Sequence, residues 1–155
     1  MNMQRFYIPG SRTTLKSDNK FKWRSNGDES VADGTVFEYY YNENFDKKTW
    51  EFYGWLGSTD DGTYIGLVFS VPYISDEPFS KVYTLSDELV ASYIYSRRLP
   101  NGTEFIVVRP EGAQLDIRNL DPLAGTVDAS FRALYHNSGK LLEVQGNFHL
   151  HRDDL

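Results

Sequence analysis

The chain has 155 residues, no cysteine and a formal net charge of −6 at pH 7. That length suits a single domain with a sizeable core, and the absence of cysteine excludes disulfides, thiolate metal sites and cysteine nucleophiles. No stretch approaches the roughly 20 apolar residues of a membrane helix, and the opening Met-Asn-Met-Gln-Arg-Phe-Tyr-Ile-Pro-Gly lacks the apolar run of a secretory signal, so we expect a cytoplasmic protein with no membrane partner.

The N-terminal part of the chain is basic, whereas the rest is acidic. Residues 1–25 contain six Lys and Arg residues and a single acid, Asp18, while the remainder contains 10 basic and 21 acidic residues. This asymmetry indicates either docking of the first segment onto its own domain or a basic arm for a partner, with residues 1–20 as a partly mobile arm. An acidic body repels phosphates, so we expect no nucleic-acid partner.

The first half of the chain reads as short strands separated by turns. Residues 21–23 alternate, Asn26-Gly27 and Asp33-Gly34 are turn dipeptides, and residues 35–41 form an aromatic-rich strand. Residues 49–56 and 63–71 then alternate as the two strands of a predicted antiparallel hairpin around Asp60-Asp61-Gly62.

The middle of the chain is less regular. Residues 72–78 begin and end with proline, which donates no backbone hydrogen bond and interrupts a ladder. Residues 81–85 are a further candidate strand, and residues 86–92 are the best candidate for a short helix, with Ser86 as its cap. Residues 92–98 and 103–109 flank Pro100-Asn101-Gly102, which is typical of a tight hairpin.

The C-terminal hairpin has the clearest alternation. After a short candidate strand at residues 114–118, residues 125–135 and 142–150 alternate apolar and polar side chains on either side of Asn137-Ser138-Gly139. The whole chain, 1–155, therefore predicts one all-β domain, an antiparallel β-sandwich or β-barrel of about nine or ten strands with at most one short helix. The sequence does not separate a sandwich from a closed barrel.

Aromatic residues are concentrated between positions 37 and 55. Outward-facing Tyr and Trp rings combine apolar area with a polar group and suit a protein or sugar surface, although rings at these spacings also stack across strands in ordinary cores. The predicted ligand- or partner-binding residues are Tyr39, Tyr41, Trp50, Tyr53 and Trp55.

Residues that could carry catalysis or bind a metal form no recognisable motif. His149 and His151 share a strand face and are weak metal candidates, because a zinc site would need a further ligand such as His136 or Asp128. Adjacent acids such as Asp153-Asp154 are expected to be solvated. We therefore predict no metal, no cofactor and no catalytic residue. The remaining candidates for an enzyme are His149 and four strand acids, Glu38, Glu51, Glu104 and Asp128.

Three functions stay open at this point. A non-enzymatic domain that binds a partner protein through an acidic, aromatic-containing surface fits the composition best, because acidic faces steer basic partners. A small-ligand or carbohydrate-binding barrel with an aromatic pocket is the first alternative. A hydrolase or isomerase-type barrel enzyme is the second, and the sequence leaves the choice between monomer and homodimer undecided.

Overall fold

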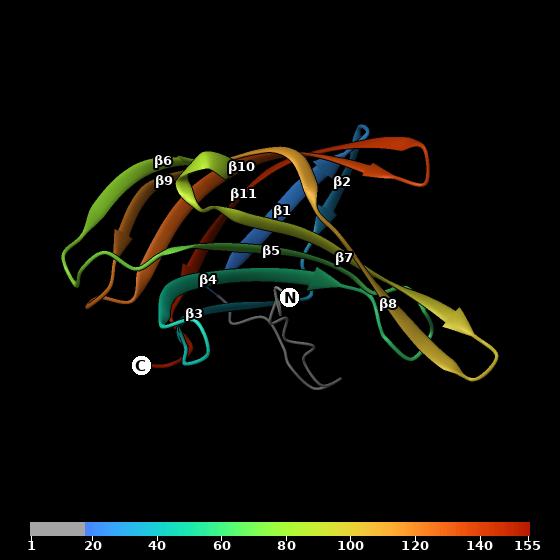
Figure 1. The fold of residues 1–155 in the computed structure, drawn as a ribbon, viewed down its shortest axis with the longest axis horizontal. Coiled ribbons are helices and arrows are strands. Elements are labelled where there is room, and N and C mark those ends of the chain that lie inside the picture. Colours follow the sequence, from blue (N-terminus) through green and yellow to red (C-terminus); the bar gives the residue numbers. More distant parts are fainter. Residues whose placement is uncertain (1–17) are drawn as a thin grey trace.

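Two antiparallel sheets pack face to face in the computed structural model, which describes residues 18–155 (Figure 1). Residues 1–17, which include most of the predicted N-terminal arm, lie outside the described part. The two sheets remain separate, so the sandwich is the alternative that the structure confirms. The strands are β1 (Lys20–Ser25), β2 (Asp28–Val31), β3 (Gly34–Asn42), β4 (Lys47–Leu56), β5 (Ile65–Pro72), β6 (Phe79–Thr84), β7 (Val90–Leu99), β8 (Gly102–Val108), β9 (Pro110–Asp121), β10 (Thr126–Asn137) and β11 (Lys140–His151).

The chain passes back and forth between the two sheets. The strand order is β2-β1-β11-β10-β9-β6 in the six-stranded sheet and β3-β4-β5-β7-β8 in the five-stranded sheet. Successive strands mostly pair as hairpins, while the β2–β3, β5–β6, β6–β7 and β8–β9 connections cross between the sheets. The pairing of β1 with β11 joins the first described strand to the last one.

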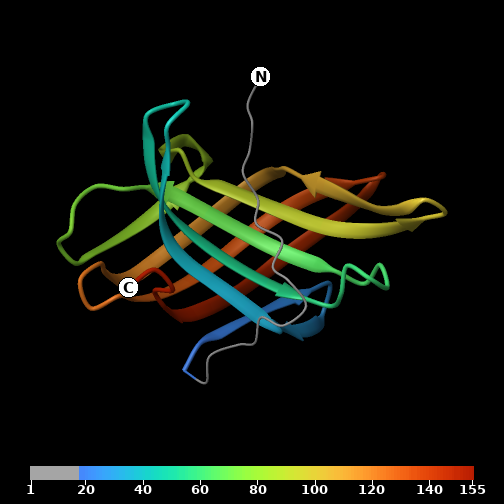
Figure 2. The same cartoon turned by 90° about the horizontal axis from the view of Figure 1, so that it is seen from below.

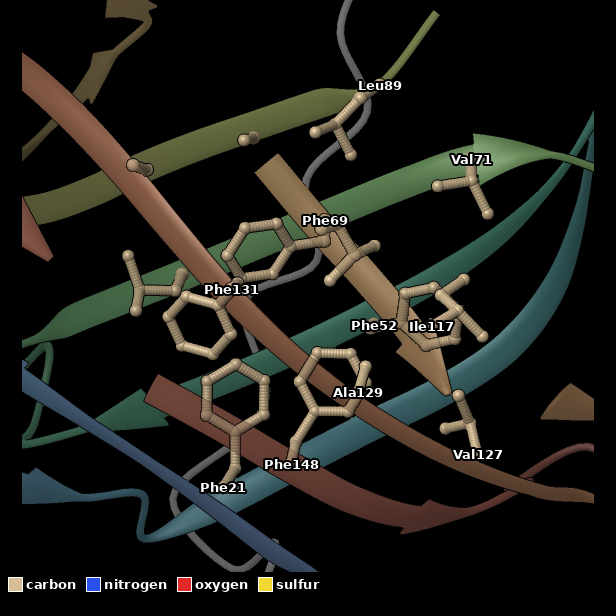
Figure 3. Packing of buried hydrophobic residues seen from close by; sticks show 14 of the residues in the cluster. Phe21, Phe52, Phe69, Val71, Leu89, Ile117, Val127, Ala129, Phe131 and Phe148 are labelled. Atoms are coloured by element: carbon tan, nitrogen blue, oxygen red, sulfur yellow. The ribbon is translucent and has the colours of Figure 1, made fainter. Parts of the chain in front are cut away.

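Phenylalanine rings fill the space between the sheets (Figure 3). The ring of Phe131 lies 4.6 Å from that of Phe69, and the ring of Phe148 lies 5.1 Å from Phe21 and 5.2 Å from Phe52, measured between centroids. Gly54 leaves room for this packing, because a Cβ there would lie 2.6 Å from the Phe21 ring. Stacked and tilted ring contacts of this kind add to the hydrophobic gain of burying large rings.

The alternation predicted from the sequence is present in the structure. Along β10 the side chains of Val127, Ala129 and Phe131 are buried between the sheets, and the intervening residues face outward. The turn after β10 uses Ser138 and Gly139 with φ values of 52° and 77°, the left-handed backbone that a tight type I′ turn requires.

Two elements differ from the prediction. Residues 86–92 do not form a helix: a single 3-10 turn spans Leu85–Asp87 and ends at Glu88, whose φ is 64°. One turn gains too few hydrogen bonds to propagate, and Leu89 and Ala91 are instead buried in the core at the start of β7. The short strand β2 was not predicted, which is why the total is 11 strands.

Within residues 18–155, the structure contains no helix of the length and apolar character that crossing a membrane requires.

Candidate functional site

The five predicted binding residues lie in two different places. Tyr39, Tyr41 and Trp50 lie near the β3–β4 turn, with Tyr39 and Trp50 packed in the core between the sheets, whereas Tyr53 and Trp55 belong to the outer face of the five-stranded sheet. Tyr41 is 41% exposed, but Trp50, Tyr53 and Trp55 are only 1%, 3% and 5% exposed. Whether any of these rings binds a partner stays a prediction, and most of their area is already packed against other residues.

An aromatic cluster forms at the end where β3 meets the β5–β6 connection. The Tyr39 ring lies 5.8 Å from Trp50 and 5.3 Å from Tyr73, with near-perpendicular ring planes, and Trp50 lies 5.6 Å from Tyr73. The sequence did not predict Tyr73, because it follows Pro72 in a segment that reads only as a break between strands. The Trp50 Nε1 donor is buried and has no hydrogen-bond acceptor among the described residues.

Carboxylates accept hydrogen bonds from the hydroxyls of Tyr73, in this cluster, and of Tyr41, two residues along β3 from Tyr39. Tyr41 donates to Asp46 Oδ1 at 2.7 Å, and Tyr73 donates to Asp76 Oδ1 at 2.5 Å. Because each carboxylate accepts a hydrogen bond only from the neutral hydroxyl, the pKa values of Tyr41 and Tyr73 are raised above their ordinary value. The hydroxyls are therefore oriented toward the acids.

The C-terminal tail completes the cluster. The Arg152 guanidinium lies 4.9 Å from the Trp50 ring centroid and donates to both carboxylate oxygens of Asp154 at 2.8 and 2.9 Å. This two-point hydrogen bonding lowers the pKa of Asp154 and raises the pKa of Arg152. Arg152 also donates to the Pro122 carbonyl at 2.9 Å, which ties the β9–β10 turn to the same end.

The tail also occupies the free edge of β3. Asp153 accepts from the Phe37 backbone N–H at 2.8 Å, and Asp154 accepts from the Tyr39 N–H at 3.1 Å. The expectation that Asp153-Asp154 would be only solvated is therefore wrong. Unpaired backbone groups on an edge strand invite pairing with other chains, and here two carboxylates satisfy them.

Exposed apolar and acidic residues surround the cluster. Figures 1 and 2 show the β3–β4 turn, the β5–β6 connection, the β9–β10 turn and the C-terminus gathered at one end of the sandwich. We call this surface the tyrosine–carboxylate end. Its exposed large apolar residues are Tyr41, Phe45, Ile74, Leu123 and Leu155. Its carboxylates are Glu43, Asp46, Asp76, Glu77, Asp121, Asp153 and Asp154, and its cations are Lys47, Lys48 and Arg152.

A second surface is hollowed into a groove of about 600 Å³ on the outer face of the six-stranded sheet. Its polar lining carries three cations, two acids and several amide or hydroxyl groups. Trp23 and Phe131 contribute to the lining but are 3% and 5% exposed, so they offer little ring area to a ligand. The polar lining residues are Lys22, Arg24, Glu29, Gln114, Asp116, Ser130, Arg132, Gln145 and Asn147.

The remaining candidate residues do not form one site. Asp128 and His149 are cross-strand partners on the outer face of the six-stranded sheet, with Oδ1 and Nδ1 2.7 Å apart, and the His149 and His151 rings lie 5.2 Å apart. Glu38 and Glu51 belong to the other sheet.

The last two candidates are engaged elsewhere. Glu104 pairs with Arg97 at 2.5 Å, and His136 lies 3.9 Å from Glu111. In the part of the chain that the structure describes, no group of three or more His, Asp or Glu side chains could hold a metal ion.

Comparison with known proteins gives no match: no protein-family model, no curated protein and no solved structure resembles this chain closely enough to assign it.

Proposed function

We propose that this protein is a non-enzymatic binding domain that holds a basic partner protein at its tyrosine–carboxylate end. The observation that carries the proposal is the clustering of oriented tyrosines, exposed apolar side chains and carboxylates around the C-terminal tail. Tyr41 and Phe45 are 41% and 47% exposed beside Asp46. Tyrosine is enriched among residues that dominate binding energy at protein interfaces.

Charge supports the choice of a basic partner. Carboxylates outnumber cations at this end, and Arg152 is already committed to Asp154 through two hydrogen bonds. An acidic surface accelerates encounter with a basic partner, and the effect weakens with salt because the Debye length is only about 8 Å at physiological ionic strength. We propose that this encounter takes place in the cytoplasm. A chain without cysteine has no disulfide bonds that the reducing conditions there would break.

Affinity capture from the native lysate with matched variants tests the proposal. The double variant Tyr41→Ala/Phe45→Ala removes exposed rings from the tyrosine–carboxylate end, whereas Leu99→Ala/Leu141→Ala removes exposed apolar residues elsewhere. We expect one partner to be retained by the wild type and by the control, and to bind the ring variant at least roughly tenfold more weakly. Equal retention by both variants would contradict the proposal.

The groove on the six-stranded sheet supports a second candidate function, the binding of a small polar ligand. Arg24, Gln145 and Arg132 lie side by side on β1, β11 and β10, so cations flank an amide across three strands. Such a row suits a ligand with carboxylate and hydroxyl groups.

Thermal-shift titration with acidic and neutral oligosaccharides tests this second function. We expect stabilisation by the acidic set alone. Arg132→Gln should abolish the shift, whereas Arg118→Gln, outside the groove lining, should leave it in place. A shift that survives in Arg132→Gln would exclude this role for the groove.

A further inference from the structure

The outer face of the five-stranded sheet is buried, although a sandwich of only two sheets would leave this face in contact with water. In a sandwich, one face of each strand meets the other sheet and the opposite face meets water. In β5, however, six consecutive residues, 66–71, are all buried. A strand buried on both faces needs a covering layer on each.

The side chains on this face form their own apolar cluster. Ile94 is fully buried and Tyr53, Trp55, Tyr64 and Val68 are between 2% and 5% exposed, with the partly buried Val36, Phe105 and Val107 packed against them. We call these eight residues the outer apolar face. Viewed from below, none of the strands or turns of residues 18–155 lies over the five-stranded sheet (Figure 2).

We propose that residues 1–17 of the same chain bind the outer apolar face as a third layer. Chain length permits it, because 17 extended residues reach about 55 Å, whereas the five strands span only about 19 Å at a spacing of about 4.8 Å. The starting point is also suitable. Asn19 donates to Thr35 Oγ1 at 3.1 Å and accepts from the His151 N–H at 2.9 Å, which fixes the chain beside β3, the edge strand of this sheet.

The composition of the segment matches the face. Residues 1–17 include the consecutive apolar residues Phe6, Tyr7 and Ile8, as well as Leu15. Burying side chains of this size against the outer apolar face removes apolar area from water and therefore stabilises the fold.

Charge complementarity points to the same occupant. Glu38 and Glu51 are direct cross-strand partners on β3 and β4, beside the outer apolar face. Like charges in this arrangement destabilise a sheet, and both carboxylates have interaction partners. Residues 1–17 carry cations and no acid, and they would place Arg5, Arg12 or Lys16 near these carboxylates.

Cross-linking in the full chain tests the proposal, since the protein has no native cysteine. Ile8→Cys is combined with Ser70→Cys, on the outer face of β5, or with Ser130→Cys, on the outer face of the six-stranded sheet as the matched control. With a short bis-maleimide, and a reaction time long enough for the covered thiol to react, we expect an intramolecular cross-link for Ser70→Cys and little for Ser130→Cys. Equal yields at both positions, or none at Ser70→Cys, would overturn the proposal.

The same experiment distinguishes other occupants. Cross-links that join two chains and increase with protein concentration would assign the outer apolar face to a second copy, and would also overturn the proposal.

A second measurement does not depend on the pair of cysteine positions chosen for cross-linking. In the full chain, the single Ser70→Cys thiol should react at least roughly tenfold faster with a maleimide when Phe6, Tyr7 and Ile8 are all changed to Ser, because the cover is lost. An unchanged rate would contradict the docking of this segment.

Discussion

The outer faces of the two sheets are built on the same two-residue alternation but carry opposite chemistry. On the six-stranded sheet, the outward positions of β10 hold Asp128, Ser130 and Arg132, and the neighbouring strands form a polar groove. On the five-stranded sheet, the outward positions hold Val68 and Ile94, which are almost completely buried. The difference shows that alternation identifies two faces, whereas the residue types on the second face decide whether water or another layer covers it.

The largest expected effect separates the two faces directly. Replacing Ile94 by Ala should lower the free energy of unfolding by about 2–4 kcal/mol, since a fully buried side chain leaves a cavity. Ser130→Ala, at a half-buried outward position of the other sheet, should change it by no more than about 0.5 kcal/mol. Guanidinium denaturation of both variants measures the two changes in the free energy of unfolding. Similar decreases would show that the outer faces of the two sheets are equally buried.

A smaller effect is expected from the polar pair within the outer apolar face. The hydroxyls of Tyr53 and Tyr64 are hydrogen-bonded to each other and buried. Either single change to Phe leaves one buried hydroxyl without its partner and should cost about 1–2 kcal/mol. The double variant should cost less than the sum of the two single variants, and strictly additive losses in urea denaturation would argue against the pairing.

Alkaline pH should destabilise the fold in part through the buried tyrosine pair of the outer apolar face. Burial raises the pKa of Tyr53 to about 12, and burial together with the Tyr53 hydroxyl raises the pKa of Tyr64 as well. The folded state therefore keeps these protons while unfolded tyrosines ionise near pH 10. Stability from these groups is complete below about pH 10 and is lost as the pH rises toward about 12.

Denaturation curves across this range, compared with those of a Tyr53→Phe/Tyr64→Phe variant, measure the effect. We expect the variant to lose less stability than the wild type. Tyrosinate absorbance that develops for all 11 tyrosines at the ordinary pH would contradict the assignment.

The smallest effect is expected in the polar groove. Arg24 and Glu29 lie 3.5 Å apart, with side chains 64% and 48% exposed. Because water screens such a pair, Glu29→Gln should lower the free energy of unfolding by about 0.5 kcal/mol or less, and salt should remove the difference. A loss comparable to that of Ile94→Ala would mean that the groove is as tightly packed as the outer apolar face.

Local patterns in the sequence were sufficient for most of the sandwich. The alternation of residues 125–135 and 142–150 and the Ser138-Gly139 turn predicted the β10–β11 hairpin. Asn101-Gly102 likewise predicted the β7–β8 hairpin. These features depend on contacts between residues close in the chain, where backbone preference and side-chain period act together.

The surfaces depend on contacts that no local pattern contains. Trp50 and Trp55 both belong to an aromatic-rich segment, but one lies in the core under Arg152 and the other on the outer apolar face. Nothing near Asp154 indicates that it binds the edge of β3, more than 100 residues earlier. Residues 86–92 have a cap and acids typical of a helix start, yet the burial of Leu89 and Ala91 draws them toward the core.

The pairing of β1 with β11 constrains how the chain can acquire its structure during synthesis. Phe21 and Trp23 are synthesised more than 100 residues before Phe148 and Gly146, their partners across the ladder. Until then these apolar rings have no sheet to join, and closing so long a loop is slow. We therefore expect nascent chains that end before β11 to be prone to aggregation and to depend on chaperones.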